Sequence, residues 1–233
     1  MGAYSDRVIA DGASYYWRLG DTVGTTAVAA VGGANGTISG GVTLGQPGAV
    51  SGDTAMTFNG TSGKIVTTVA AALLTPFTVE FWIRRNSTVD NQVVFCNTWG
   101  TGDNIAIFAS TTGCYVYTPT GSATCPIPLD AQWHHVVVLL AGGVSIRLYL
   151  DGVLQSVTDV TPATFAAGVA KAIEIGFDPN WTYFNGSLDE VAIYPRALTA
   201  PEITAHYTLA TTSAGGGVRT LSFGYWKQHW HVA

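Results

Sequence analysis

Short turn-forming sequences recur along this chain at intervals that leave room for little more than a strand between them. They include Asn35-Gly36, Gly40-Gly41, Asn59-Gly60, Gly142-Gly143, Asp151-Gly152 and Asn185-Gly186. Asn-Gly, Asp-Gly and Gly-Gly pairs adopt the positive φ values that tight hairpin turns require. Regular turns of this kind are typical of antiparallel sandwiches and jelly rolls. The pattern therefore predicts an all-β fold in which two antiparallel sheets pack face to face.

The segments between the turns have the length and residue types of strands. Strands are predicted at 54–58, 77–84, 92–96, 105–109, 135–140, 145–150, 172–176 and 186–194. Successive side chains of a strand point to opposite faces, so Val79, Phe81 and Ile83 share one face. Trp82 then lies on the other face between charged neighbours, which predicts a half-buried tryptophan on a concave surface.

Helices are expected to be rare in this chain. Charged residues make up 11% of it, against about 25% in an average protein, and lysine and glutamate, both strong helix formers, are scarce. One short helix is predicted at 199–207, where Thr199 serves as the N-cap, Pro201 occupies an early helical position and Glu202 completes the start.

The charge divides the chain into two parts. Residues 1–213 carry eight basic and fifteen acidic side chains, a net charge of −7, whereas the remainder carries two basic residues and no acidic one. We therefore predict one domain at 1–212, a glycine-rich linker at 213–217 and a separate tail at 218–233. An acidic domain argues against nucleic-acid binding, which needs a basic surface. No apolar run approaches the roughly 18–20 residues of a membrane span.

The N-terminus and the cysteines bear on the cellular compartment. Residues 1–16 lack the basic and apolar regions of a signal peptide, and the chain starts at Met1, so no signal peptide is expected. Cys114 and Cys125 flank a turn, where they could form a hairpin disulfide or remain reduced thiols. The Cys and His spacing matches no zinc site.

One stretch near the end of the predicted domain carries a family likeness. Residues 183–199 (YFNGSLDEVAIYPRALT) resemble the closing signature of laminin-G-like, concanavalin A-type jelly-roll domains. Further segments match in order, namely 16–21 (YWRLGD), 56–60 (MTFNG), 77–82 (FTVEFW), 133–136 (WHHV) and 147–152 (RLYLDG). The likeness covers about residues 4–210 and implies two antiparallel sheets, one of them concave, in a domain that binds sugars, proteins or other surfaces.

The resemblance also implies a structural calcium ion. By analogy Asp189 would be the chief side-chain ligand, assisted by the loop at Asp21 or at Asp53. Calcium takes six to eight oxygen ligands, and carboxylates with backbone carbonyls would suffice. Relatives often carry an Asp where this chain has 28–30 (VAA), so the alternative is that Asp189 only accepts hydrogen bonds from loop amides.

Catalysis is not expected, although glucanases share this fold. Retaining glycosidases need two carboxylates about 5 Å apart, which those relatives supply from an E-x-D-x-E strand that this chain lacks. Asp189 and Glu190 are adjacent and are predicted to face opposite ways. The same alternation separates His134 from His135, so these histidines are interpreted as packing residues.

Aromatic residues in or beside predicted loops are the candidates for ligand binding. Sugar sites need stacking aromatic rings with hydrogen-bonding groups nearby, and four residues meet this description: Trp99, Tyr117, Trp181 and Tyr183. The loop 178–183 (DPNWTY) is the richest. Exposed loop aromatics also form assembly surfaces, and the sequence leaves both readings open.

The tail is predicted to bind a partner, because aromatic and arginine residues dominate interface hot spots. Its candidate contact residues are Arg219, Phe223, Tyr225, Trp226, Lys227 and Trp230. Residues 4–19 and 40–49 also resemble the version of this domain found in bacteriophage structural and bacterial surface proteins. Together these features predict a non-catalytic virion surface protein, attached by its tail to a capsid or tail protein or to a second copy of itself, that binds host glycans. The alternatives are a secreted bacterial carbohydrate-binding or adhesion module and, for the tail, an extension without function.

Overall fold

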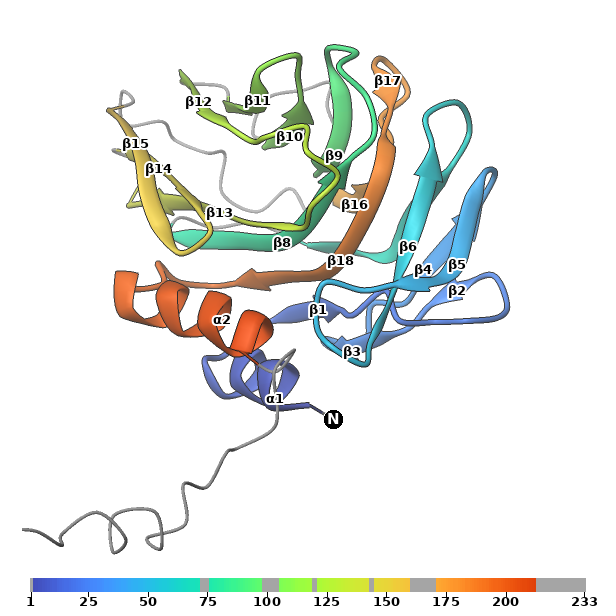
Figure 1. Ribbon diagram of the computed structural model, residues 1–233, viewed down its shortest axis with the longest axis horizontal. Helices are drawn as coiled ribbons and strands as arrows, with labels where there is room; N and C mark the ends of the chain where they lie inside the picture. Colours follow the sequence, from blue (N-terminus) through green and yellow to red (C-terminus); the bar gives the residue numbers. More distant parts are fainter. Residues whose placement is uncertain are drawn as a thin grey trace, which may run out of the picture.

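The computed structural model describes residues 2–71, 76–97, 105–118, 121–142, 145–159 and 171–212. Within them the chain forms a sandwich of two largely antiparallel sheets (Figure 1). The first sheet contains, in order, β15 (Val153–Asp159), β14 (Ser145–Leu150), β13 (His134–Ala141), β8 (Phe77–Arg85), β18 (Asn185–Tyr194), β1 (Tyr15–Trp17) and β3 (Ala29–Val31), with β6 (Thr54–Asn59) paired to β18 and β5 (Val42–Pro47) to β6.

The second sheet covers the inner face of the first. It contains, in order, β12 (Gly121–Pro126), β11 (Gly113–Thr118), β10 (Ala106–Ala109), β9 (Gln92–Cys96), β16 (Lys171–Ile175), β7 (Lys64–Ala71), β4 (Gly36–Ser39) and β2 (Thr26–Ala27), with β17 (Thr182–Tyr183) pairing parallel to β9. The predicted all-β sandwich is confirmed, and each of the predicted strands lies within or overlaps an observed one. The linker and tail proposed at 213–233 lie outside the described residues, so that division stays a prediction.

Two helices pack on the outer face of the first sheet (Figure 1). The predicted helix is present as α2 (Ala200–Thr212) and is longer than expected. The other, α1 (Ala3–Ala10), was not predicted. Its side chains Tyr4 and Val8 are buried against the sheet, so tertiary burial rather than local helix preference stabilises it. No helix in the described part of the chain is long and apolar enough to cross a membrane.

The main core fills the space between the sheets, and alternation along β8 places Val79, Phe81 and Ile83 in it as predicted. The prediction for Trp82 was wrong, because this residue is 1% exposed. The two helices cover it: its Nε1 donates to the Tyr4 hydroxyl at 3.1 Å, and Tyr207 of α2 stacks on its ring at 5.9 Å.

A fully buried carboxylate, Glu80, joins the helices to the first sheet. Its two oxygens accept hydrogen bonds from Tyr4 (2.8 Å), His135 Nε2 (2.8 Å), Tyr194 (2.7 Å) and His206 Nδ1 (2.9 Å). The other ring nitrogen of His206 lies 2.9 Å from Asp11 Oδ2. Carboxylates only accept hydrogen bonds, so both nitrogens of His206 donate and the ring is an imidazolium. The negative charge of Glu80 is therefore compensated inside the protein.

This cluster predicts a window of maximum stability. Burial would raise the pKa of Glu80, but the facing His206 and the hydrogen bonds from His135 and His206 outweigh it and hold that pKa well below 4.5. Burial lowers the pKa of His206, yet Glu80 and Asp11 raise it above 6.5. The contribution of Glu80 is complete above its unfolded pKa and lost as pH falls, and that of His206 is complete below its unfolded pKa and lost as pH rises.

We expect the cluster to stabilise the fold most between pH 4.5 and 6.5, the ordinary values of the two groups. The measurement is the melting temperature of the wild type and of His206→Gln across the pH range. The difference between the two proteins should be largest in this window and shrink above it. A difference that stays constant up to about pH 9 would contradict the imidazolium assignment.

Candidate functional site

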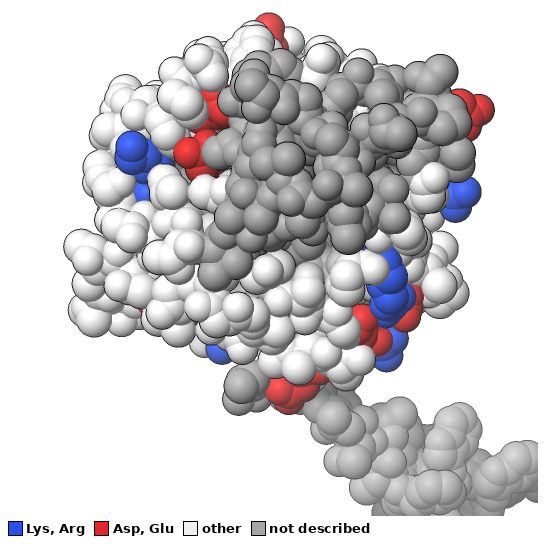
Figure 2. Space-filling view, turned by 180° about the vertical axis from the view of Figure 1, so that it is seen from behind, with Lys and Arg blue, Asp and Glu red and all other residues white. Residues whose placement is uncertain are grey.

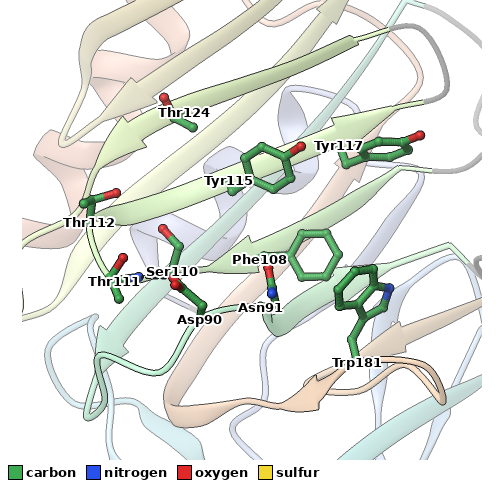
Figure 3. A pocket seen from close by; sticks show the side chains of 10 residues that line it. All are labelled: Asp90, Asn91, Phe108, Ser110, Thr111, Thr112, Tyr115, Tyr117, Thr124 and Trp181. Carbon is green, nitrogen blue, oxygen red and sulfur yellow. Dashed lines mark hydrogen bonds between the residues drawn. The ribbon is translucent and has the colours of Figure 1, made fainter.

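An open pocket of about 570 Å³ lies on the outer face of the second sheet, on the side of the sandwich away from the helices (Figure 3). Alternation along β10 and β11 creates it. Ile107 and Val116 point into the core, so Phe108, Tyr115 and Tyr117 point outward. The loop between β16 and β17 adds Trp181.

One half of the pocket is aromatic. The ring of Trp181 meets that of Phe108 edge to face, with centroids 5.4 Å apart and an angle of 71° between the planes. Phe108 in turn contacts Tyr115 at 6.0 Å. Phe108 is buried, whereas Trp181 is 38% exposed. Figure 3 shows these rings beside one another along one side of the pocket, continued by Tyr117. They form an apolar platform that solvent reaches.

The other half of the pocket is polar. Its side chains are Asp90, Asn91, Ser110, Thr111, Thr112 and Thr124. The Asp90 carboxylate fixes this end by accepting a hydrogen bond of 2.6 Å from the Thr111 amide. Hydroxyl, amide and carboxylate groups beside a stacking platform are the combination that recognises a polar ring with apolar faces.

The loop that carries Trp181 is held by Asp178. The backbone carbonyl of Asp178 accepts from the Trp181 amide at 3.2 Å, and its Oδ1 accepts from the Asn180 amide at 2.8 Å. At the other end of the loop, Thr182 donates its amide to the carbonyl of Asn91 at 3.2 Å. Trp181 therefore stands on a turn anchored on both sides.

Of the four predicted ligand-binding residues, Tyr117 and Trp181 line this pocket. Tyr183 is not among the residues that line it, because its ring packs on Phe177 with centroids 4.9 Å apart. Trp99 lies outside the described residues. Phe108 and Tyr115 were missed, although the alternation of 113–118 (GCYVYT) with a core-facing valine could have indicated an outward tyrosine.

The residues predicted to bind calcium gather in part. Asp189 is fully buried; its Oδ2 accepts from the Ala49 amide at 2.8 Å, and its Oδ1 has no hydrogen-bond partner. Gly48 permits this approach, since a Cβ there would lie 2.8 Å from Asp189 Oδ2. Asp53 pairs with Arg18. Asp21 lines a smaller pocket of about 240 Å³ together with Arg18 and Asp53. Its Oδ2 accepts a hydrogen bond from the Val28 amide at 3.1 Å.

Glu190 completes this acidic group, contrary to the prediction that it faces away from Asp189. A bulge interrupts β18 here: the register against β8 shifts between Asp189 and Ala192, and Glu190 has a φ of +54°. Strict alternation therefore fails. Burial and the charge of Asp53 raise the pKa of Asp189. Burial and the charge of Asp189 raise the pKa of Glu190. Arg18 is the cation among these three carboxyl groups, with its Nε 3.7 Å from Glu190.

The two histidines and the two cysteines singled out in the sequence are all buried or nearly so. His135 is buried against Glu80 and His134 bonds Asp151 at 2.8 Å, so both are packing residues as predicted. Cys114 and Cys125 face each other across the β11–β12 hairpin as unlinked, buried thiols.

A second cluster lies behind the Trp181 loop and was not found in the sequence. The ligand-type atoms of Cys96, Glu174 and Asp178 lie within 4.8 Å of one another, and all three residues are buried. Burial and the neighbouring Asp178 raise the pKa of Glu174 to about 7, against the opposing charge of Lys64. Cys96 is far from Glu174 and Asp178 in the sequence and meets them only because β9 pairs with β16.

Two antiparallel sheets with an aromatic pocket on one outer face define a lectin-like jelly-roll domain. The family model described as the concanavalin A-like lectin/glucanases superfamily matches residues 58–204, and the chain belongs to that superfamily. Comparison with curated protein sequences finds no match.

Solved structures confirm the fold. Domain 4 of AbnA, an extracellular arabinanase from Geobacillus stearothermophilus in complex with arabinotriose, matches with a TM-score of 0.62 and 21% identity over 85% of this chain and 98% of that one. The binding domain of botulinum neurotoxin serotype D/C gives 0.67 and 16% over 88% and 54%. The DC binding domain in complex with rat synaptotagmin II gives 0.65 and 17% over 88% and 53%. The chain thus spans about half of the two toxin domains.

Proposed function

We propose that this chain is a non-catalytic carbohydrate-binding domain and that the pocket around Trp181 is its sugar site. The observation that carries the proposal is the exposed Trp181 ring set against Phe108, with hydroxyl and amide side chains across the pocket. A sugar would place an apolar ring face on Trp181 and its hydroxyls toward Asp90, Asn91 and the threonines. The arabinotriose complex of the arabinanase domain supports this substrate class.

Binding without hydrolysis agrees with the chemistry of the pocket. Glycosidases place two carboxyl groups about 5–9.5 Å apart across the scissile bond. Among the described residues that line the pocket, Asp90 is the one carboxylate, and it is exposed and tied to the Thr111 amide. Low surface charge also suits neutral sugars: the described part of the face in Figure 2 shows charged side chains only in small separate groups.

The test is an oligosaccharide array probed with the full chain, with arabinotriose included as a defined ligand. We expect saturable binding to at least one neutral oligosaccharide. A folded chain that binds none would contradict the proposal.

The biological setting is proposed separately. We propose a virion surface protein that presents this pocket and is attached to a capsid or tail protein through residues 218–233, because the aromatic and basic tail contrasts in charge with the acidic domain. Deletion of 215–233 should leave a folded domain that no longer associates with particles. A second candidate setting is a secreted carbohydrate-binding module, which the similarity to the domain of an extracellular arabinanase favours. If the intact chain binds sugar but does not associate with particles, the secreted module is the better description.

We also propose a calcium ion at Asp189 and Asp53, next to Asp21. The residues fit a cation, because Arg18 pairs with both Asp53 and Glu190, the charge of Asp53 also acts on Asp189, and a buried oxygen of Asp189 has no hydrogen-bond partner. Bound calcium would compensate the excess negative charge and tie the loop at Ala49 to β18.

Chelation should then lower stability. At a calcium concentration of about 100 times Kd, removal of the ion is expected to lower the melting temperature by about 5–10 °C. The measurement is thermal denaturation with calcium and with EDTA, and Asp189→Asn should lose the difference. An unchanged melting temperature, with no metal detected by mass spectrometry, would contradict the proposal.

A further inference from the structure

The cluster formed by Cys96, Glu174 and Asp178 has the donors of a metal site. Cys96 on β9 and Glu174 on β16 are directly paired across the second sheet, and Asp178 follows β16 in the loop below Trp181. Their exposed fractions are 0%, 8% and 1%. Buried acidic groups are costly unless they are paired or bind a metal.

Two observations point to a missing cation. The first is that Oε2 of Glu174 is buried and has no hydrogen-bond partner, in a carboxylate that places an oxygen within 4.8 Å of the ligand-type atoms of Cys96 and Asp178. The second is the spacing of Cys96 Sγ and Asp178 Oδ2, which are joined by a thiol hydrogen bond of 3.5 Å that a metal ion would replace. Tetrahedral zinc with Zn–S of about 2.3 Å and Zn–O of about 2.1 Å separates sulfur from oxygen by about 3.6 Å.

We infer that Cys96, Glu174 and Asp178 bind one zinc ion, with a fourth position left for water. Zinc accepts mixed thiolate and carboxylate ligands, whereas calcium and magnesium do not select a thiolate. Binding converts the Cys96 thiol to a thiolate and releases its proton to solvent. One thiolate and two carboxylates carry three negative charges, and zinc with the nearby Lys64 balances them.

The site would also stiffen the proposed sugar pocket. Asp178 would hold zinc through Oδ2 while its Oδ1 and carbonyl keep their bonds to Asn180 and Trp181. This consequence rests on the proposed function, but metal binding does not, so the two are measured separately.

The test is cobalt(II) titration of the EDTA-treated full chain, since cobalt replaces zinc and reports a thiolate ligand by a charge-transfer band in the near ultraviolet. Every protein in this titration also carries His229→Asn and His231→Asn, which remove the histidines of the tail as competing cobalt ligands. We expect one cobalt per chain, a charge-transfer band, and displacement by zinc. Cys96→Ser should abolish the band, and Cys114→Ser and Cys125→Ser should keep it.

A second variant covers the case in which Cys96→Ser does not fold. Glu174→Gln keeps the size of the side chain and should weaken zinc binding at least tenfold, because even changes behind a metal ligand cost 10- to 100-fold. Absence of the band in the wild type, its survival in folded Cys96→Ser, or unchanged zinc affinity in Glu174→Gln would each overturn the inference. Sugar binding that is unaffected by zinc would reject only the link to the pocket.

Discussion

Replacement of Glu80 by alanine is expected to lower the free energy of unfolding by about 3–5 kcal/mol, the usual cost of removing one partner of a buried ion pair. The carboxylate accepts hydrogen bonds from Tyr4, His135, Tyr194 and His206. Its loss leaves Nδ1 of the charged His206 and the hydroxyl protons of Tyr4 and Tyr194 without an acceptor, and Asp11 is then the carboxylate that stays bonded to His206. Domains of this kind are stable by about 5–15 kcal/mol in total, so the variant should melt far below the wild type.

Glu202→Gln is the matched control for Glu80. Glu202 is also a glutamate that pairs with a cation, Arg196 at 2.9 Å, but its side chain is 21% exposed. An exposed ion pair contributes about 0–1 kcal/mol. Urea denaturation of both variants measures the difference. Equal losses for Glu80→Ala and Glu202→Gln would show that the buried cluster does not fix the helices to the sheet.

Replacement of Trp181 by alanine is expected to weaken oligosaccharide binding at least thirtyfold, equivalent to about 2 kcal/mol for a hot-spot aromatic residue. The ring is the exposed part of the aromatic platform and packs against Phe108, so its loss removes the surface on which a sugar would stack. Calorimetric titration with the oligosaccharide found on the array measures the change.

Two further variants make this prediction specific. Trp181→Phe keeps an aromatic face and should retain part of the affinity. Val157→Ala removes an exposed apolar side chain from β15, at the edge of the other sheet, and should bind like the wild type. If Trp181→Ala binds as tightly as Val157→Ala, the platform is not the sugar site.

The strands could be predicted from the sequence because turn pairs and alternation are local signals. Segments such as 92–96 and 145–150 match β9 and β14 in full. Helix α1 could not be predicted, since it is held by the burial of Tyr4 against Glu80 and Trp82, residues more than seventy positions away. Trp82 was misassigned for the same reason: the cover that buries it comes from both ends of the domain.

Of the pocket residues, those in loops were easier to predict from the sequence than those in strands. Trp181 stands out in a polar turn, and it does line the pocket. Phe108 lies in β10, where both faces are apolar, so hydropathy could not show which face points away from the core, whereas the alternation in β11 held a signal for Tyr115. Cys96, Glu174 and Asp178 meet only through strand pairing, and the bulge at Glu190 changes side-chain direction without a glycine to mark it.

The most direct test of the sugar site is a nuclear magnetic resonance titration of the labelled full chain with the bound oligosaccharide. We expect the largest chemical-shift changes on the Trp181 indole and on the amides of Phe108, Tyr115 and Tyr117, which line the pocket. Shifts concentrated instead on the helices or on β15, with these resonances unchanged, would contradict this expectation.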